Sequence, residues 1–145
     1  MKFTNEIRDF ILGYLAGDGP TPNGQACRFM EYNGIGIKFY GASECKAEYA
    51  FEAQTRAAEV DIGPQTGDFF TINLRLAPSN SIKLYGYLTE IATDVGEDPL
   101  HDTAVELAEK MEENGFSTYD FGVNNCGWVG GKYVCIDFDP LSMGV

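Results

Sequence analysis

Residues 116–139 read FSTYDFGVNNCGWVGGKYVCIDFD, and the interpretation of the whole chain starts from this stretch. Asp120 is followed five residues later by Asn125, and Asp137 stands at the end of an apolar run. The pair Gly130-Gly131 between them is typical of a tight hairpin turn. Two carboxylates and a side-chain amide are therefore expected on either side of one short hairpin. Oxygen ligands of this kind suit Mg²⁺, and a separate carboxylate is left to orient a nucleophile.

This pattern resembles the catalytic region of protein-kinase-like folds. In that family four residues separate the catalytic-loop aspartate from an asparagine, as they separate Asp120 from Asn125. A second motif of the family, which binds metal, begins with Asp-Phe, and Asp137 is likewise followed by Phe138. The resemblance implies that Asp120 is catalytic and accepts or orients the proton of an attacking hydroxyl. It also implies that Asn125 and Asp137 bind Mg²⁺ together with ATP.

The resemblance implies an α+β fold in two unequal parts. Residues 1 to about 92 would form the small lobe, an antiparallel sheet with a helix, and residues from about 93 to 145 a heavily truncated large lobe. A chain of 145 residues, 44% of them apolar, has the length and composition of a single domain. Only eight residues follow Asp137, so neither an activation segment nor a helical large lobe is expected. The chain is similar to short kinase-like proteins of bacteriophages.

The charge of the chain limits its partners. There are 22 acidic and 10 basic residues, which give a formal charge of −12. A surface of this sign repels phosphates, so a stable complex with nucleic acid is not expected. The acidity favours a basic protein as partner, or serves solubility.

The cysteines and the N-terminus indicate a reducing compartment. Cys27, Cys45, Cys126 and Cys135 form no C-x-x-C pair, and His101 is the single histidine, so no zinc site is expected and the thiols should be reduced. The N-terminus lacks the pattern of a signal peptide, and no apolar run has the length of a membrane span. The expected location is the cytoplasm, of its own cell or of a host.

Periodicity predicts the order of helices and strands. The expected elements are a helix over 5–16, strands over 26–32 and 35–40, a helix over 43–61, strands over 69–76 and 82–92, and a helix from Asp98 to Gly115. Asn33-Gly34 is a strong hairpin signal. Asp98 and Pro99 are expected at the N-cap and first position of the last helix. This order matches a kinase-like small lobe followed by the first helix and hairpin of the large lobe.

Lys38 is the candidate for a phosphate-binding lysine. Alternation over 35–39 puts Ile35, Ile37 and Phe39 on one face of a strand and Lys38 on the other. In kinase-like folds a lysine in a similar Ile-Lys context holds the α- and β-phosphates of ATP, so the resemblance gives Lys38 a role in cofactor binding and catalysis. The alternative is a surface lysine on a half-buried strand.

The resemblance implies two further contacts to ATP. The lysine needs a carboxylate from the following helix, because an unpaired ammonium in a cleft would swing out or lose its charge. Glu52 is the first choice and Glu48 the rival, although Glu52 could instead pair with Arg56 along the helix. Glu90 and Ile91 fall where the family has its adenine-binding hinge. A plain strand at that point is the alternative.

Several positions depart from the family pattern. Thr118-Tyr119 replace the His-Arg that precedes the catalytic aspartate, and Asp139 replaces a glycine after Asp-Phe. The glycine loop that covers the phosphates has only a weak counterpart in residues 17–24, since Pro20 and Pro22 lack the backbone N–H donors that phosphate needs.

The sequence therefore predicts two alternative functions. The first is a kinase-like protein that binds ATP and Mg²⁺, with phosphotransfer atypical or lost. The alternative is a pseudokinase-like acidic interaction protein, for example a phage inhibitor of a basic host or regulatory protein. A DNA mimic is a third, less favoured possibility, because the carboxylates are not regularly spaced.

Overall fold

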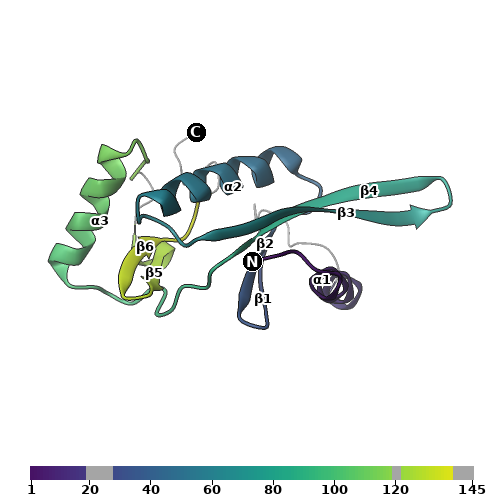
Figure 1. Ribbon diagram of the computed structural model, residues 1–145, viewed down its shortest axis with the longest axis horizontal. Coiled ribbons are helices and arrows are strands. Elements are labelled where there is room, and N and C mark those ends of the chain that lie inside the picture. Colours follow the sequence, from purple (N-terminus) through teal and green to yellow (C-terminus); the bar gives the residue numbers. More distant parts are fainter. Residues whose placement is uncertain (19–27, 119–121, 139–145) are drawn as a thin grey trace.

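The computed structural model describes residues 1–18, 28–118 and 122–138. These residues form three α-helices, a four-stranded antiparallel sheet and a separate two-stranded hairpin, an α+β arrangement (Figure 1). The elements are α1 (Asn5–Asp18), β1 (Arg28–Tyr32), β2 (Ile35–Phe39), α2 (Glu44–Glu59), β3 (Thr66–Ala77), β4 (Asn80–Thr89), α3 (His101–Glu113), the 3₁₀ turn η1 (Val123–Asn125), β5 (Cys126–Val129) and β6 (Lys132–Cys135). None of the helices in the described residues is long and apolar enough to span a bilayer.

The four-stranded sheet has the order β1-β2-β4-β3. The β1–β2 hairpin turns at Asn33 and Gly34, whose φ angles of 49° and 78° are those of a type I′ turn. The hairpin predicted from Asn33-Gly34 is thereby confirmed, as are the helices over 5–16 and 43–61. The strand predicted over 82–92 ends earlier, at Thr89.

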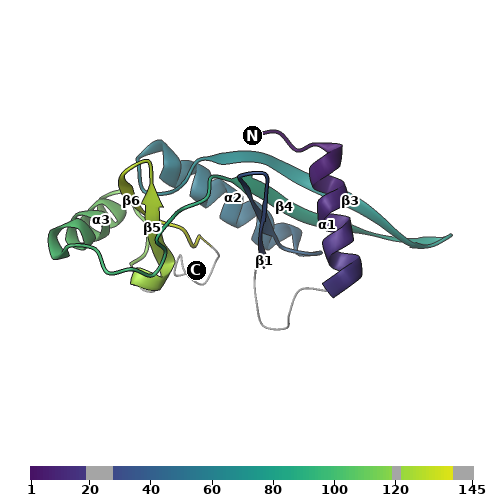
Figure 2. The same ribbon diagram turned by 90° about the horizontal axis from the view of Figure 1, so that it is seen from below.

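Helices α1 and α2 cover opposite faces of the sheet (Figures 1 and 2). Alternation along each strand decides which side chain meets which helix. Ile37 and Leu88 face α1 and join its core with Ile7 and Ile11. Tyr87 faces α2. Lys38, between Ile37 and Phe39, also points to the α2 face, as the alternation predicts.

Each of the first two helices is fitted to its face of the sheet. The Thr4 hydroxyl accepts a hydrogen bond from the Ile7 N–H at 3.2 Å, which caps the start of α1. The buried stripe of α2 is built almost entirely of alanines, which allow the helix axis to approach the sheet closely; these are Ala47, Ala50, Ala53, Ala57 and Ala58. Ser43 stands at the N-cap of α2 without a side-chain capping bond.

Helix α3 begins later than its capping signal predicts. Its N-cap is Leu100, with φ −60° and ψ 145°, and the Leu100 carbonyl accepts the bonds of the first turn from Thr103 and Ala104. Because Leu100 is extended, Asp98 and Pro99 lie outside the helix. Leu100 itself is 81% exposed.

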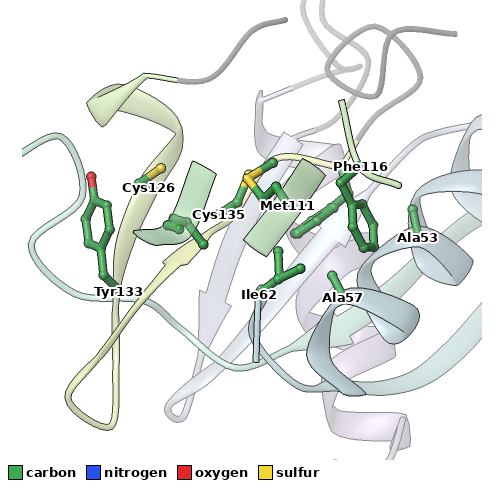
Figure 3. Packing of buried hydrophobic residues seen from close by; sticks show 10 residues of the cluster. Ala53, Ala57, Ile62, Met111, Phe116, Cys126, Tyr133 and Cys135 are labelled. Carbon is green, nitrogen blue, oxygen red and sulfur yellow. The ribbon is translucent and has the colours of Figure 1, made fainter. Parts of the chain in front are cut away.

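A second apolar cluster lies beneath the C-terminal end of α2 (Figure 3). It joins α2, α3 and the β5–β6 hairpin, whose turn at Gly130 and Gly131 has φ angles of 55° and 82°. Its buried members are Ala53, Ala57, Ile62, Leu107, Met111, Phe116, Cys126, Tyr133, Cys135 and Phe138. The hairpin predicted around Gly130-Gly131 is confirmed.

Candidate functional site

Lys38 lies where three parts of the chain meet. From β2 its Nζ donates a hydrogen bond to Gln54 Oε1 on α2 at 2.9 Å. A second bond goes to the carbonyl oxygen of Ile136, just after β6. The ammonium also stands 5.8 Å from the ring centroids of both Tyr87 and Phe138. The lysine is therefore half-buried and held by named contacts, rather than a side chain on an open surface.

Gln54 is the hub of this polar network. Its side chain is fully buried, and its Oε1 accepts from Lys38 and from the Tyr87 hydroxyl at 2.8 Å. Its Nε2 donates to the Pro64 carbonyl at 3.0 Å and to Thr89 Oγ1 at 2.7 Å. Both hydrogens of the amide and its oxygen are thus used, as burial of a polar group requires. The network ties α2 to the ends of β2 and β4.

The α2 contact of Lys38 therefore differs from the one predicted. Glu52 is exposed, and so is its rival Glu48, because the helix turns them away from the sheet. Gln54, two residues after Glu52, comes round to the buried face. Only carboxylates were predicted as partners of Lys38. A signal was present in the sequence, since Gln54 interrupts the alanine stripe at a position where an exposed glutamine would not fall.

Asn125 and Asp137 flank the open end of the β5–β6 hairpin. The Ile136 N–H donates to the Asn125 carbonyl at 2.9 Å. The segments just before β5 and just after β6 therefore lie side by side. The same Ile136 carries the carbonyl that binds Lys38, and Asp137 follows it directly. The Lys38 ammonium thus lies next to the backbone that carries Asp137, through a contact between residues 98 positions apart.

Other predicted positions lie outside the described residues. Asp120, the proposed catalytic carboxylate, is one of them, together with Tyr119 and Asp139. Most of the glycine- and proline-rich segment, residues 19–27, is another.

The predicted hinge residues follow β4 directly. The Glu90 N–H donates to the Gln65 carbonyl at 2.9 Å, and the Glu90 carboxylate accepts from the Gln65 N–H at 2.7 Å. The Glu90 carbonyl accepts from the Thr89 hydroxyl at 3.0 Å. The backbone of Glu90 is therefore engaged within the protein. Among the described residues Ile91 makes no backbone hydrogen bond.

A backbone bridge then places the chain after Ile91 beside the hairpin. Thr93 and Trp128 exchange two hydrogen bonds of 2.9 Å each. Gly127 permits this approach, since a Cβ there would stand 3.0 Å from the Cβ of Ala92 and from the Thr93 carbonyl oxygen. The end of β4 and the base of the hairpin consequently face one another.

Asn125 and Asp137 are the oxygen donors that the resemblance assigns to a metal ion. Among the described residues no group of three or more His, Cys, Asp or Glu side chains could hold an ion. Asn125 and Asp137 supply one amide oxygen and one carboxylate. Mg²⁺ is commonly held by only one or two protein carboxylates, with water and substrate phosphates completing its octahedron. These two residues fit an ion that arrives with a phosphate ligand, and would not form a self-sufficient site.

Two thiols lie at the base of the same hairpin. A hydrogen bond from Cys135 holds the pKa of the Cys126 thiol below its usual range, and the same contact, with burial, raises the pKa of Cys135 well above it. Burial, with the neighbouring Cys126, raises the pKa of Tyr133 to about 12. The predicted free state of Cys45, Cys126 and Cys135 agrees with the structure.

A groove of about 440 Å³ separates α3 from the hairpin. Trp128 and Leu107 are among its apolar walls, and Lys110 lies at its edge. Asp61 and Lys132 also line it and form an ion pair of 2.7 Å. Of the residues predicted for the nucleotide site, those that the structure describes do not line this groove.

Comparison of the chain with known proteins does not assign it to a family. No family model matches the chain, and no curated protein matches it either.

Proposed function

We propose that the protein binds a magnesium–nucleotide complex at the junction of β2, α2 and the β5–β6 hairpin. The observation that carries the proposal is the hydrogen bond from Lys38 to the Ile136 carbonyl. This bond sets an ammonium group beside the residue that precedes Asp137. A cation for phosphate oxygens and oxygen ligands for Mg²⁺ thereby occur together, as nucleotide binding requires.

Each side chain has a distinct task in this proposal. Lys38 contacts the phosphates, and Gln54 orients the ammonium without adding negative charge of its own. Asn125 and Asp137 hold the metal, which neutralises charge on the phosphate oxygens when it is bound. Asp120 is the proposed base for a hydroxyl acceptor. Positioning and charge neutralisation provide most of the catalysis in phosphoryl transfer, so a small scaffold could retain some of it.

The base of the nucleotide is assigned to the segment after β4. Glu90 uses its backbone groups within the protein, so the hinge contact is proposed for the backbone of Ile91. On this proposal residues 1–92 correspond to a kinase-like small lobe and 93–145 to the remnant of a large lobe. The protein would act in the cytoplasm, where its free thiols are kept reduced.

Calorimetric titration of the full chain with ATP and Mg²⁺ tests the proposal. The parent protein should bind, and chelation of Mg²⁺ should weaken binding. Lys38→Ala and Asp137→Ala should each lower affinity tenfold or more, equivalent to about 1.4 kcal/mol of binding free energy. Lys46→Ala is the matched control, because Lys46 is an exposed lysine on α2 and should leave affinity unchanged.

Loss of folding must be separated from loss of binding. Lys38→Met keeps much of the apolar stem while removing the charge, and circular dichroism checks that both Lys38 variants retain their helices and strands. If titration of the parent with ATP and Mg²⁺ gives no heat of binding, the nucleotide proposal is rejected. If the parent binds and both folded Lys38 variants bind equally well, the site lies elsewhere.

One observation favours the second candidate, an acidic interaction protein. The outer face of α3 is exposed and carries Asp102, Glu106, Glu109, Glu112 and Glu113. Exposed Leu100 adjoins this face at its N-terminal end. A basic protein partner would be steered to such a surface, and its association would weaken as salt rises. Charge reversal at Glu106, Glu109 and Glu113 should reduce capture of basic proteins. If neither charge reversal nor added salt changes the capture of basic proteins, the outer face of α3 is not the contact surface.

A further inference from the structure

The register of the β5–β6 hairpin sets two cysteines directly opposite one another. Its two-residue turn is closed by Val129 and Lys132, and Cys126 pairs with Cys135 three steps further on. In a hairpin of this type the closing pair is hydrogen-bonded, and bonded and non-bonded pairs alternate along the ladder. Cys126 and Cys135 therefore form a non-hydrogen-bonded pair.

An independent contact supports this assignment. The next pair along the ladder is Asn125 with Ile136, and the Ile136 N–H donates to the Asn125 carbonyl at 2.9 Å. Non-bonded pairs have the closer Cα atoms, about 4.5 Å apart. Disulfides span Cα separations of roughly 4.4–6.8 Å. The backbone thus already holds the two cysteines within bonding range, at the short end.

The thiols face the same side of the hairpin and are covered by protein. Cys126 is fully buried and Cys135 is 5% exposed, and both belong to the cluster that contains Met111 and Phe138 (Figure 3). The Cys135 thiol donates to the Asp137 carbonyl at 3.7 Å. Neither thiol has a part in the proposed binding of nucleotide.

We propose that Cys126 and Cys135 form a reversible intramolecular disulfide across the hairpin when the protein meets a hydroperoxide. With hydrogen peroxide, one thiol sulfur attacks the peroxide, the O–O bond breaks, and a sulfenic acid and one water form. The second thiol displaces the sulfenic hydroxyl as another water. In total, two S–H bonds and one O–O bond break, one S–S bond forms, and two waters carry away both thiol protons and the peroxide oxygens.

Oxidation would alter the base of the hairpin. The Cys135 S–H is consumed, so the Asp137 carbonyl loses a donor. The covalent bond also prevents the strands from separating next to Asn125 and Ile136. Because the strands are already adjacent, the disulfide should close with little movement of the backbone, and a dithiol should reverse it. The pair therefore acts as a redox switch beside the Lys38 junction, and this inference does not depend on nucleotide binding.

The test uses the full chain with Cys27→Ser and Cys45→Ser, which leaves one candidate pair. The folded protein is treated with hydrogen peroxide, the remaining thiols are alkylated, and the products are mapped by mass spectrometry after proteolysis. Both thiols should disappear together, with a linked peptide that contains Cys126 and Cys135 and a mass lower by two hydrogens. Dithiothreitol should restore two alkylatable thiols.

Two outcomes would overturn the proposal. One is a native protein in which the two thiols are oxidised separately to sulfinic acids, with no linked peptide. The other is a protein whose thiols both remain alkylatable at peroxide concentrations that oxidise exposed Cys45 in the parent. Cys126→Ala and Cys135→Ser in the same background should each give no linked peptide. Near-ultraviolet circular dichroism of the double-serine protein, compared with the parent, checks that it is folded, so that a negative result with folded protein counts against the inference.

Discussion

Gln54 shows how a single buried residue can organise three elements. Its amide joins Lys38 on β2, Tyr87 and Thr89 on β4, and the Pro64 carbonyl that follows α2. A glutamate at this position would supply charge but no N–H donors. The amide satisfies donors and acceptors together, which a buried site of mixed polarity requires.

We predict that Gln54→Ala lowers the free energy of unfolding by about 3 kcal/mol, because it leaves buried hydroxyl groups and a half-buried ammonium without their partner. Glu52→Ala is the control on the same helix, since an exposed residue should change stability by less than about 0.5 kcal/mol. Urea unfolding followed by circular dichroism measures both. Equal effects of the two substitutions would contradict the role assigned to Gln54.

For single residues, the sequence predicted the face on which a side chain lies better than it predicted the residues that the side chain contacts. The side of β2 on which Lys38 lies followed from alternation, because strand geometry is local. Its helix partner did not, because it depends on how α2 is rotated against the sheet. The contact with Ile136 joins residues 98 positions apart, and no local pattern encodes such a pair.

At the scale of elements, an exposed ion pair links the end of α2 to the hairpin. Lys132 on β6 donates to the carboxylate of Asp61 at 2.7 Å. This hydrogen bond, followed by the charge of Lys132, lowers the pKa of Asp61 below its ordinary value of 3.8. A lowered folded-state pKa means that the carboxylate form is stabilised by folding. The contribution to stability is therefore present above about pH 3.8 and is lost as pH falls through the lowered pKa.

We predict that Lys132→Ala returns the pKa of Asp61 upward toward its ordinary value. Carboxyl chemical shifts followed by NMR through an acid titration measure this change. The stability difference between parent and variant should be small at neutral pH, because the pair is exposed, and should vanish under acid conditions. Lys83→Ala, on the distant β3–β4 hairpin, is the control. An Asp61 pKa unmoved by Lys132→Ala would show that the ion pair is absent in solution.

Element boundaries illustrate where local signals fail. The two glycine-containing turns were predicted, because positive φ angles are required there and glycine or asparagine supplies them. The predicted start of α3 was wrong by two to three residues. Its Asp-Pro signal is a genuine capping pattern, but the extended conformation of Leu100 places the first helical hydrogen bonds beyond it.

At the scale of the whole molecule, the described residues form three apolar clusters. One lies between α1 and the sheet, one lies between α2 and the sheet, and one joins the end of α2 to α3 and the hairpin. Phe138 belongs to the last of these and is only 1% exposed. Its ring approaches Gly63, where an added Cβ would stand 2.9 Å away, and meets Phe116 edge-on. The segment after β6 is thus anchored to the region that follows α2.

We predict that Phe138→Ala lowers the free energy of unfolding by about 3–5 kcal/mol. Hydrogen exchange should show lost protection in α3, β5 and β6, while α1 and β1–β4 keep more of theirs. Phe3→Ala is the matched control, because Phe3 stacks on Phe70 in the cluster between α1 and the sheet at 4.4 Å. It should loosen α1 and its face of the sheet instead. Uniform loss of protection in both variants would mean that the two clusters unfold as one.

The order of elements was largely predicted from sequence, whereas their arrangement was not. Periodicity gives each helix and strand separately. The strand order β1-β2-β4-β3, and the rotation of Gln54 into the core, depend on long-range packing. For the candidate site, the sequence identified Lys38, Asn125 and Asp137 by resemblance, and the structure bonds Lys38 to the carbonyl of Ile136, the residue before Asp137. Their role in binding a nucleotide stays a prediction.

The β3–β4 hairpin extends beyond the N-terminal end of α2 as a narrow arm (Figure 1). From Arg75 to Lys83 its side chains are exposed, and its tip at Pro78-Ser79 contacts none of the three apolar clusters. Exposed turns of this kind tolerate inserted sequence. The arm therefore offers a handle for a fluorophore or an epitope, through which the protein could be immobilised or tracked without touching the Lys38 junction.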